Sequence, residues 1–189
     1  MIGITSYGAY IPRLRLDRMA IFQAMGWFAP AIMMVAQGER SMCNWDEDAI
    51  TMAVAASRDC LQGQDKQKLD ALYLASTTLP FADRQNAGIV SAALNLKDEL
   101  ITADYTASQK VATTALITAL DTIKGGARSN IMVTATDRFP DGTRNTRLMT
   151  PLPSVLRPRK PFFVWSKGIS TVVSPSTAIV TVPALMGQL

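Results

Sequence analysis

The side chains best suited to chemistry lie where an apolar stretch, Leu100–Tyr105, turns through a small-residue bend, Thr106–Ser108, into a helix rich in Ala, Thr and Leu. A group at such a bend meets the free N–H groups and partial positive charge of a helix N-terminus. Ser108 carries a hydroxyl, but a serine nucleophile requires an adjacent base. The chain contains no histidine, and Asp104 precedes the bend on a different element. We therefore interpret Ser108 as a helix N-cap.

The other reactive groups give no catalytic pattern. Cys60 falls inside an expected helix, where a buried apolar role is favoured. Cys43 precedes an expected loop, where a reactive thiol is the alternative. The acidic run Asp46–Asp48 is interpreted as charge that stabilises a helix N-terminus. The sequence has no glycine-rich nucleotide loop and no Cys/His metal spacing, so we expect neither a resident cofactor nor a metal.

Four segments of the chain carry a further pattern: Gly3–Arg13, Trp45–Asp48 with Thr51–Ala53, Tyr73–Ala82, and Ser108–Leu116. Together they resemble the hydroxymethylglutaryl-CoA synthase branch of the thiolase superfamily. The first resembles the opening strand of that family with its Pro-Arg turn, the second the start of its second helix, and the third its third strand with the following loop. The fourth, Ser108–Leu116, corresponds to the family pattern Ala-Cys-(Lys/Tyr)-(Ala/Gly)-Gly-Thr-Ala-Ala-(Leu/Ile).

The resemblance places the catalytic positions of the family at residues of different chemistry. The catalytic cysteine falls at Gln109, and the glutamate of the Ser-Glu-Ser-x-Pro loop, the general acid/base, falls at Thr77. A threonine hydroxyl does not transfer protons near neutral pH as a tuned carboxylate does. The catalytic histidine has no counterpart, because the chain has none. The candidate site residues are therefore Gln109, Thr77 and, through its hydroxyl, Ser108.

The resemblance also implies the ligands and partners of the chain. It implies acyl-CoA or acyl-ACP thioesters as substrates, a cytoplasmic location, and a homo- or hetero-oligomer with a thiolase-like protein. With three catalytic positions changed, we expect no condensation activity. Two alternatives stay open: a non-catalytic thiolase-like subunit that pairs with an active partner, and a decarboxylating ketosynthase-like enzyme of the Gln type. Asp83-Arg84 is interpreted as a helix start, with a contact to a CoA phosphate as the alternative.

Strand-like and helix-like segments alternate along the first 137 residues. Strands separated by helices predict a largely parallel, buried sheet. The resemblance implies an α/β fold of the thiolase-like layered type, of which this chain corresponds to the N-terminal half only. That half has a mostly parallel, five-stranded-type sheet and a buried central helix. The strands are expected at Ile2–Tyr10, Ala71–Ser76, Leu100–Tyr105 and Asn130–Thr136, and the helices at Asp17–Met25, Asp46–Gln62, Gln85–Leu96 and Ser108–Ile123, the last ending at Gly125-Gly126.

Composition changes abruptly after Asp137. Residues 1–137 carry 12 basic and 14 acidic residues, whereas residues 138–189 carry 7 basic residues, 1 acidic residue and seven of the ten prolines. We therefore expect a thiolase-like half at 1–142 and a Pro/Arg-rich tail at 143–189. The tail is interpreted as disordered or as translated out of frame, because a frame two nucleotides later can encode family-like segments at 149–154 and 176–181. An arm for anionic ligands at Arg157–Pro161 is a further alternative.

Length and hydropathy limit the class of protein. A chain of 189 residues that is 48% apolar can bury one single-domain core. No apolar run reaches the roughly 18–20 residues that span a bilayer, and no segment has the order of a signal peptide. The most hydrophobic stretch, Met25–Val35, is interpreted as core or as a cover over an acyl pocket. Neither a membrane nor a nucleic acid is expected as a partner.

Overall fold

The computed structural model describes residues 2–27, 30–35, 37–138, 163–166, 169–172 and 178–183. The chain divides into two compact units, which are described separately. The first comprises Met1–Tyr10, Asp48–Arg138 and Pro161–Leu189, and the second comprises Ile11–Glu47 and Phe139–Lys160.

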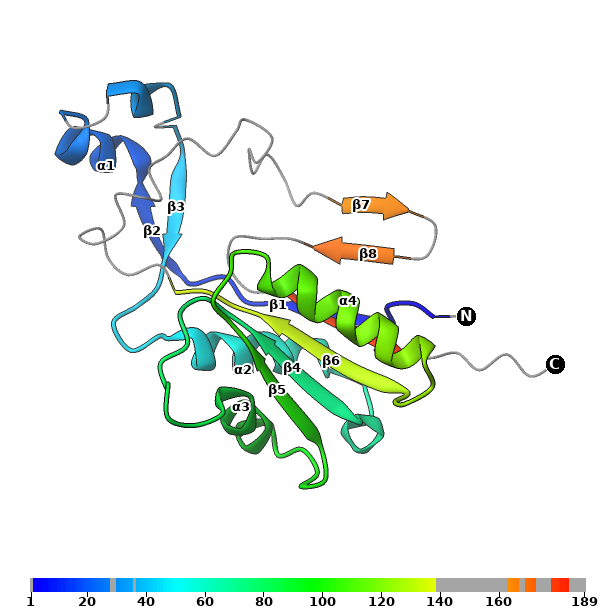
Figure 1. Cartoon of the computed structure of the whole chain (residues 1–189). Coiled ribbons are helices and arrows are strands. Elements are labelled where there is room, and N and C mark those ends of the chain that lie inside the picture. Colours follow the sequence, from blue (N-terminus) through cyan, green and yellow to red (C-terminus); the bar gives the residue numbers. More distant parts are fainter. Residues whose placement is uncertain are drawn as a thin grey trace. The chain divides into compact units, whose positions relative to one another are not determined.

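A five-stranded sheet with helices on both faces forms the first unit (Figure 1). Its strands, in spatial order, are β1 (Ser6–Ala9), β9 (Ala178–Pro183), β6 (Asn130–Ala135), β4 (Ala71–Ala75) and β5 (Ile101–Tyr105). β4 is parallel to both β5 and β6, whereas β9 is antiparallel to β6 and β1. The predicted α/β class and the parallel arrangement of β4, β5 and β6 are confirmed. The antiparallel strand β9 comes from the part of the chain interpreted as a tail.

The two faces of this sheet have separate apolar cores. β4 is buried at every position, because its alternate side chains enter opposite cores. Leu72 and Leu74 pack with α2 (Ala49–Cys60) and α3 (Asn86–Leu94). On the other face, Tyr73 packs with α4 (Val111–Lys124). A short 3-10 helix, η2 (Lys66–Lys68), precedes β4.

Helix α2 starts three residues later than predicted. Asp48 is the N-cap: its carboxylate accepts the Thr51 amide at 2.7 Å, and the Thr51 hydroxyl accepts the Asp48 amide at 2.8 Å. This reciprocal capping box fixes the helix start, so Asp46 and Glu47 lie in the preceding turn rather than in the first helical turn. Ile50 and Val54 of the helix and Leu61 at its C-cap all belong to one core.

Helix α4 packs on the sheet by one face only. Val111, Ala115, Ala119 and Ile123 are buried at helical spacing, whereas Thr113, Thr114 and Ile117 are exposed. This differs from the predicted burial on all sides: in the described chain, only the sheet side of the helix has a packing partner. The predicted terminator is confirmed, with Gly125 as the C-cap and Gly126 at φ 72°.

Asp70 ties together the amino ends of β4 and β6. Its carboxylate accepts the Ser129 and Asn130 amides at 2.9 and 3.0 Å, and Lys97 Nζ lies 3.5 Å away. Burial alone raises the pKa of the Asp70 carboxyl, but the two amides and the Lys97 ammonium outweigh it, so the pKa lies below its ordinary value. The ionised form is therefore favoured by folding.

Asp70→Asn should lower the free energy of unfolding at pH 7 by on the order of 1 kcal/mol, because the amide loses charge-assisted bonds. Because the folded pKa is depressed, this contribution is complete above the unfolded pKa and is lost as pH falls through the folded pKa. Urea denaturation at several pH values checks this. A deficit that stays constant down to strongly acidic pH would contradict it.

The second unit contains an antiparallel pair, β2 (Leu14–Asp17) and β3 (Glu39–Met42). Between these strands lie helix α1 (Arg18–Met25), capped by Asp17 as predicted, and the 3-10 helix η1 (Pro30–Val35). Trp27 and Met34 are 83% and 84% exposed. The interpretation of the stretch Met25–Val35 as core is therefore wrong for the Trp27 and Met34 side chains.

Residues after 160 contribute three strands. β7 (Phe163–Ser166) and β8 (Ile169–Val172) pair with each other, and β9 joins the large sheet. All of residues 139–162, including Arg157–Pro161, lie outside the described residues. The domain boundary at 142 and the out-of-frame interpretation of the tail therefore stay predictions. No helix among the described residues is long and apolar enough to cross a membrane.

Candidate functional site

The carboxyl ends of β4, β5 and β6 meet at one edge of the sheet, because the three strands are parallel. In open α/β sheets, ligands bind at this edge. Three segments leave it: the loop after β4, which leads to α3; the bend after β5, which leads to α4; and Thr136–Arg138 after β6. The first two hold the predicted site residues, Thr77 and Gln109.

Thr77 is held by a carboxylate from the segment that follows the neighbouring strand β6. Asp137 Oδ1 accepts the Thr77 amide at 2.6 Å, the Thr77 hydroxyl at 2.8 Å and the Ser76 hydroxyl at 3.2 Å. A second tie joins the same two segments, because the Arg138 amide donates to Thr78 Oγ1 at 2.8 Å. Thr77, the predicted counterpart of the family glutamate, is thus in direct contact with an aspartate, and sequence analysis did not predict this contact.

The bend after β5 carries Ser108 and Gln109. Ala107 has a φ of 71°, a left-handed conformation that costs a non-glycine residue about 1 kcal/mol or more. Ser108 Oγ accepts the Lys110 amide at 3.2 Å, and the helix begins only at Val111. The interpretation of Ser108 as the helix N-cap is therefore wrong: Lys110 holds that position, and the serine stabilises the turn before it.

Gln109 is exposed at this bend, and its side chain forms no hydrogen bond to any residue that the structure describes. Neither it nor Ser108 contacts Thr77 or Asp137. Thr77, Ser108 and Gln109 therefore lie at one edge of the sheet on two different loops. They are not hydrogen-bonded to one another. An exposed side chain such as that of Gln109 can be contacted by a ligand.

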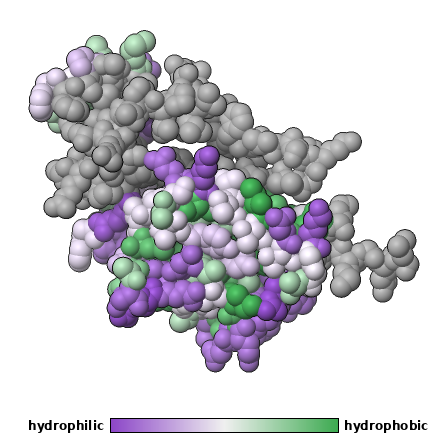
Figure 2. Space-filling view, viewed as in Figure 1, coloured by the Kyte–Doolittle hydropathy of each residue, from purple (hydrophilic) through white to green (hydrophobic). Residues whose placement is uncertain are grey.

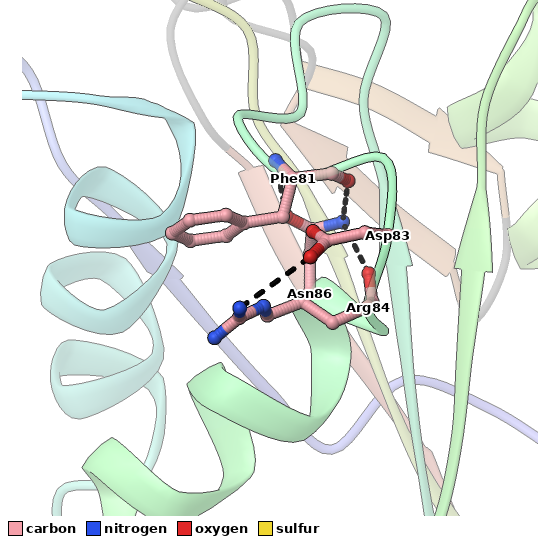
Figure 3. Close-up of polar contacts among 4 residues, drawn as sticks. All are labelled: Phe81, Asp83, Arg84 and Asn86. Carbon is pink, nitrogen blue, oxygen red and sulfur yellow. Dashed lines mark hydrogen bonds and ion pairs between the residues drawn. The ribbon is translucent and has the colours of Figure 1, made fainter.

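The loop after β4 is held from inside by Asn86 (Figure 3). This side chain is 1% exposed; its Oδ1 accepts the Phe81 amide at 3.2 Å, and its Nδ2 donates to the Phe81 carbonyl at 2.9 Å. The guanidinium carbon of Arg84 lies 5.1 Å from the centre of the Phe81 ring, and Arg84 Nη2 lies 3.5 Å from Asp83 Oδ2 (Figure 3). Asp83-Arg84 precedes α3, so its interpretation as the helix start is wrong by two residues.

Asp104 is a further residue that sequence analysis did not assign. From β5, its carboxylate accepts the Asn86 amide at 2.6 Å and the Ala87 amide at 2.7 Å. It also accepts Asn86 Nδ2 at 3.0 Å. These amides are at the N-terminus of α3, whose own N-cap, Gln85, makes no side-chain capping bond. Asp104 thus caps a helix from another element, and it positions the loop that Asn86 holds.

Together with Asp137, the predicted site residues bring hydroxyls, the Gln109 amide and a carboxylate to this edge. Of the two cysteines, Cys60 is buried at the end of α2, where its carbonyl accepts the Ser6 hydroxyl, and Cys43 belongs to the other unit. Among the described residues of the first unit, no thiol or imidazole is hydrogen-bonded to Gln109. No group of three metal-ligating residues occurs among the described residues.

Comparison with characterised proteins shows clear relatives, although no family model matches the chain. The hydroxymethylglutaryl-CoA synthase of Methanocella arvoryzae is 33% identical over 129 residues, which are 66% of this chain and 37% of that protein. The enzyme of Methanosarcina barkeri is 35% identical over 130 residues, with the same coverage of both chains. The chain thus spans little more than a third of the length of these relatives.

Solved structures show the same fold. The 3-oxoacyl-[acyl-carrier-protein] synthase III of Aquifex aeolicus matches with a TM-score of 0.73 and 20% identity, over 99% of this chain and 55% of that chain. MvaS in complex with 3-hydroxy-3-methylglutaryl coenzyme A matches with a TM-score of 0.71 and 18% identity, over 96% of this chain and 40% of that chain. These similarities confirm the predicted thiolase-like fold.

Proposed function

Because this chain is a thiolase-fold protein related to the hydroxymethylglutaryl-CoA synthases, we propose that it binds acyl-CoA thioesters without condensing them. The observation that carries the proposal is the edge formed by the ends of β4, β5 and β6, which holds the loops of Gln109 and Thr77. The resemblance aligns these two residues with the family nucleophile and acid/base. The fold can still offer a surface for a thioester there. The residues present can contact a ligand, but they do not supply a thiolate.

The proposed inability to condense thioesters follows from the chemistry of the side chains at this edge of the sheet. A glutamine amide is neither nucleophilic nor titratable near neutral pH, so Gln109 cannot form an acyl-enzyme. Ser108 has no base within its described contacts, since its hydroxyl is bonded only to the Lys110 amide. Asp137 contacts Thr77, which is on a different loop from the bend. The Asp137 carboxylate is therefore not hydrogen-bonded to Ser108, and it does not activate that hydroxyl as a nucleophile.

Incubation with acetyl-CoA should give saturable binding but no covalent adduct and no release of CoA above background. Isothermal titration measures the binding, and intact-mass spectrometry measures the adduct. Gln109→Cys should become alkylated by a thiol reagent, because the bend is exposed, and should still form no condensation product with acetoacetyl-CoA. An acetyl adduct on the unmodified chain that disappears in Ser108→Ala would contradict the proposal.

A second candidate function is pairing with another thiolase-like chain, and the exposed outer face of α4 favours it. Thr113, Thr114 and Ile117 are exposed there, and the surface in this view has separate hydrophobic side chains among residues of intermediate hydropathy (Figure 2). An apolar side chain such as Ile117, 53% exposed, is suited to an interface.

Ile117→Lys should then weaken association at least tenfold in sedimentation velocity, because the charge would be buried in the interface. The melting temperature should be unchanged. Ala93→Lys, on the exposed side of α3, is the control and should have no effect on association. Identical sedimentation of the unmodified chain and Ile117→Lys at all concentrations would exclude self-association through this face.

A further inference from the structure

Asp137 presents a carboxylate of which only one oxygen is bonded to the described residues. Oδ1 accepts three hydrogen bonds, from the Thr77 amide, the Thr77 hydroxyl and the Ser76 hydroxyl. Oδ2 receives no donor from the described part of the chain. Since a carboxylate oxygen normally accepts up to two donors, this oxygen is available to a ligand at the carboxyl edge of the sheet.

The charge of Asp137 is also not neutralised within the described residues. Its three contacts come from uncharged groups, and no ion pair involving Asp137 or the adjacent Arg138 is formed among those residues. The Arg138 amide is bonded to Thr78 Oγ1 at 2.8 Å, which holds the backbone on the other side of Asp137. The carboxylate is therefore fixed in position and half-buried, and no cation of the described residues is paired with it.

A fixed negative charge discriminates between acyl groups by two effects. It accepts a hydrogen bond from a hydroxyl on the acyl chain, and such a charge-assisted bond is stronger than a neutral one. It repels an acyl group that ends in a carboxylate, because two like charges a few ångströms apart cost free energy even in a water-like medium. Burial of the site would increase both effects.

We propose that Asp137 determines which acyl-CoA thioesters this chain binds, favouring neutral and hydroxylated acyl groups over those that end in a carboxylate. The inference rests on the proposed function, because it concerns the same edge of the sheet. It assigns to Asp137 a selectivity that differs from the proton transfer of the family glutamate, whose position Thr77 occupies. Oδ2 of Asp137 sets the selectivity, whereas the hydrogen bonds to Oδ1 hold the carboxylate in position.

The test compares three four-carbon ligands, butyryl-CoA, 3-hydroxybutyryl-CoA and succinyl-CoA, by isothermal titration with the full chain. The unmodified protein should bind 3-hydroxybutyryl-CoA at least as tightly as butyryl-CoA and succinyl-CoA about tenfold more weakly. Asp137→Asn removes the charge and can keep an oxygen toward Thr77. It should bind succinyl-CoA about tenfold more tightly than the unmodified protein does, with butyryl-CoA changed less than twofold.

Asp121→Asn is the matched control, because it changes the net charge equally from an exposed position near the far end of α4. It should leave all three affinities unchanged. If the unmodified protein binds succinyl-CoA as tightly as butyryl-CoA, the proposed selectivity of Asp137 is overturned and the proposed binding function stands. This comparison uses the unmodified protein alone, so it does not depend on whether any variant folds. If none of the three ligands binds, both are overturned.

Discussion

Gly8→Ala should destabilise the first unit by about 3 kcal/mol or more, as expected for severe overpacking of a core. A Cβ atom at Gly8 would lie 2.3 Å from the Cys60 amide nitrogen and 2.6 Å from the Ala56 carbonyl oxygen. Both atoms belong to the backbone of α2, so no side-chain rotation relieves the clash. Either α2 or β1 has to move.

The movement would also break bonds that join β1 to α2. The Ala9 amide donates to the Asp59 carboxylate at 3.0 Å, and the Ser6 hydroxyl donates to the Cys60 carbonyl at 2.6 Å. β1 is the end strand next to β9, so its displacement would weaken that pairing too. Chemical denaturation monitored by far-ultraviolet circular dichroism measures the loss.

Gly88→Ala is the matched control for this experiment. Gly88 lies within α3, and the nearest atom to an added Cβ is the Gln85 side-chain oxygen at 3.9 Å. Alanine should therefore stabilise the protein by about 0.5–1 kcal/mol, through its better helix propensity. Equal effects of the two substitutions would contradict the close packing of α2 on β1.

Most of the elements of the first 137 residues can be predicted because their signals are local. β4 and β6 are short, nearly uninterrupted apolar segments, as expected for parallel strands buried on both faces. Helix starts are less well determined. Asp46, Glu47 and Asp48 are all possible caps, and only the reciprocal bonding of Asp48 with Thr51 selects one. Strand β9 lies far along the chain from its partners, so no local pattern identifies its place in the sheet.

The candidate site was predicted less completely, for the same physical reason. A family resemblance identifies Thr77 and Gln109, because it compares positions one by one. The contact between Thr77 and Asp137 joins residues 60 positions apart, and the Asp104 contact with Asn86 joins two elements. Such contacts depend on the register of β4 with β5 and β6, which a sequence pattern does not specify.

Asp104→Ala should lower the free energy of unfolding by about 3 kcal/mol, because three donors lose a charged acceptor. Two of these are the Asn86 and Ala87 amides at the N-terminus of α3, where a negative charge is most stabilising. The third is Asn86 Nδ2, which belongs to a buried side chain. The loop that Asn86 holds at Phe81 should become less ordered as a consequence.

Asp98→Ala is the control, because Asp98 is an exposed carboxylate between α3 and β5 with no contact to the described residues, and its effect should stay within about 0.5 kcal/mol. Asp104→Asn should fall between the two, since an amide oxygen can still accept one of the α3 amides while its NH₂ group faces a second donor. Denaturant titration gives the three free energies, and amide hydrogen exchange at Asn86 and Ala87 reports on the helix start itself. Unchanged protection of those amides in Asp104→Ala would show that water replaces the carboxylate without cost, and Asp104 would then have no role in positioning the loop at the candidate site.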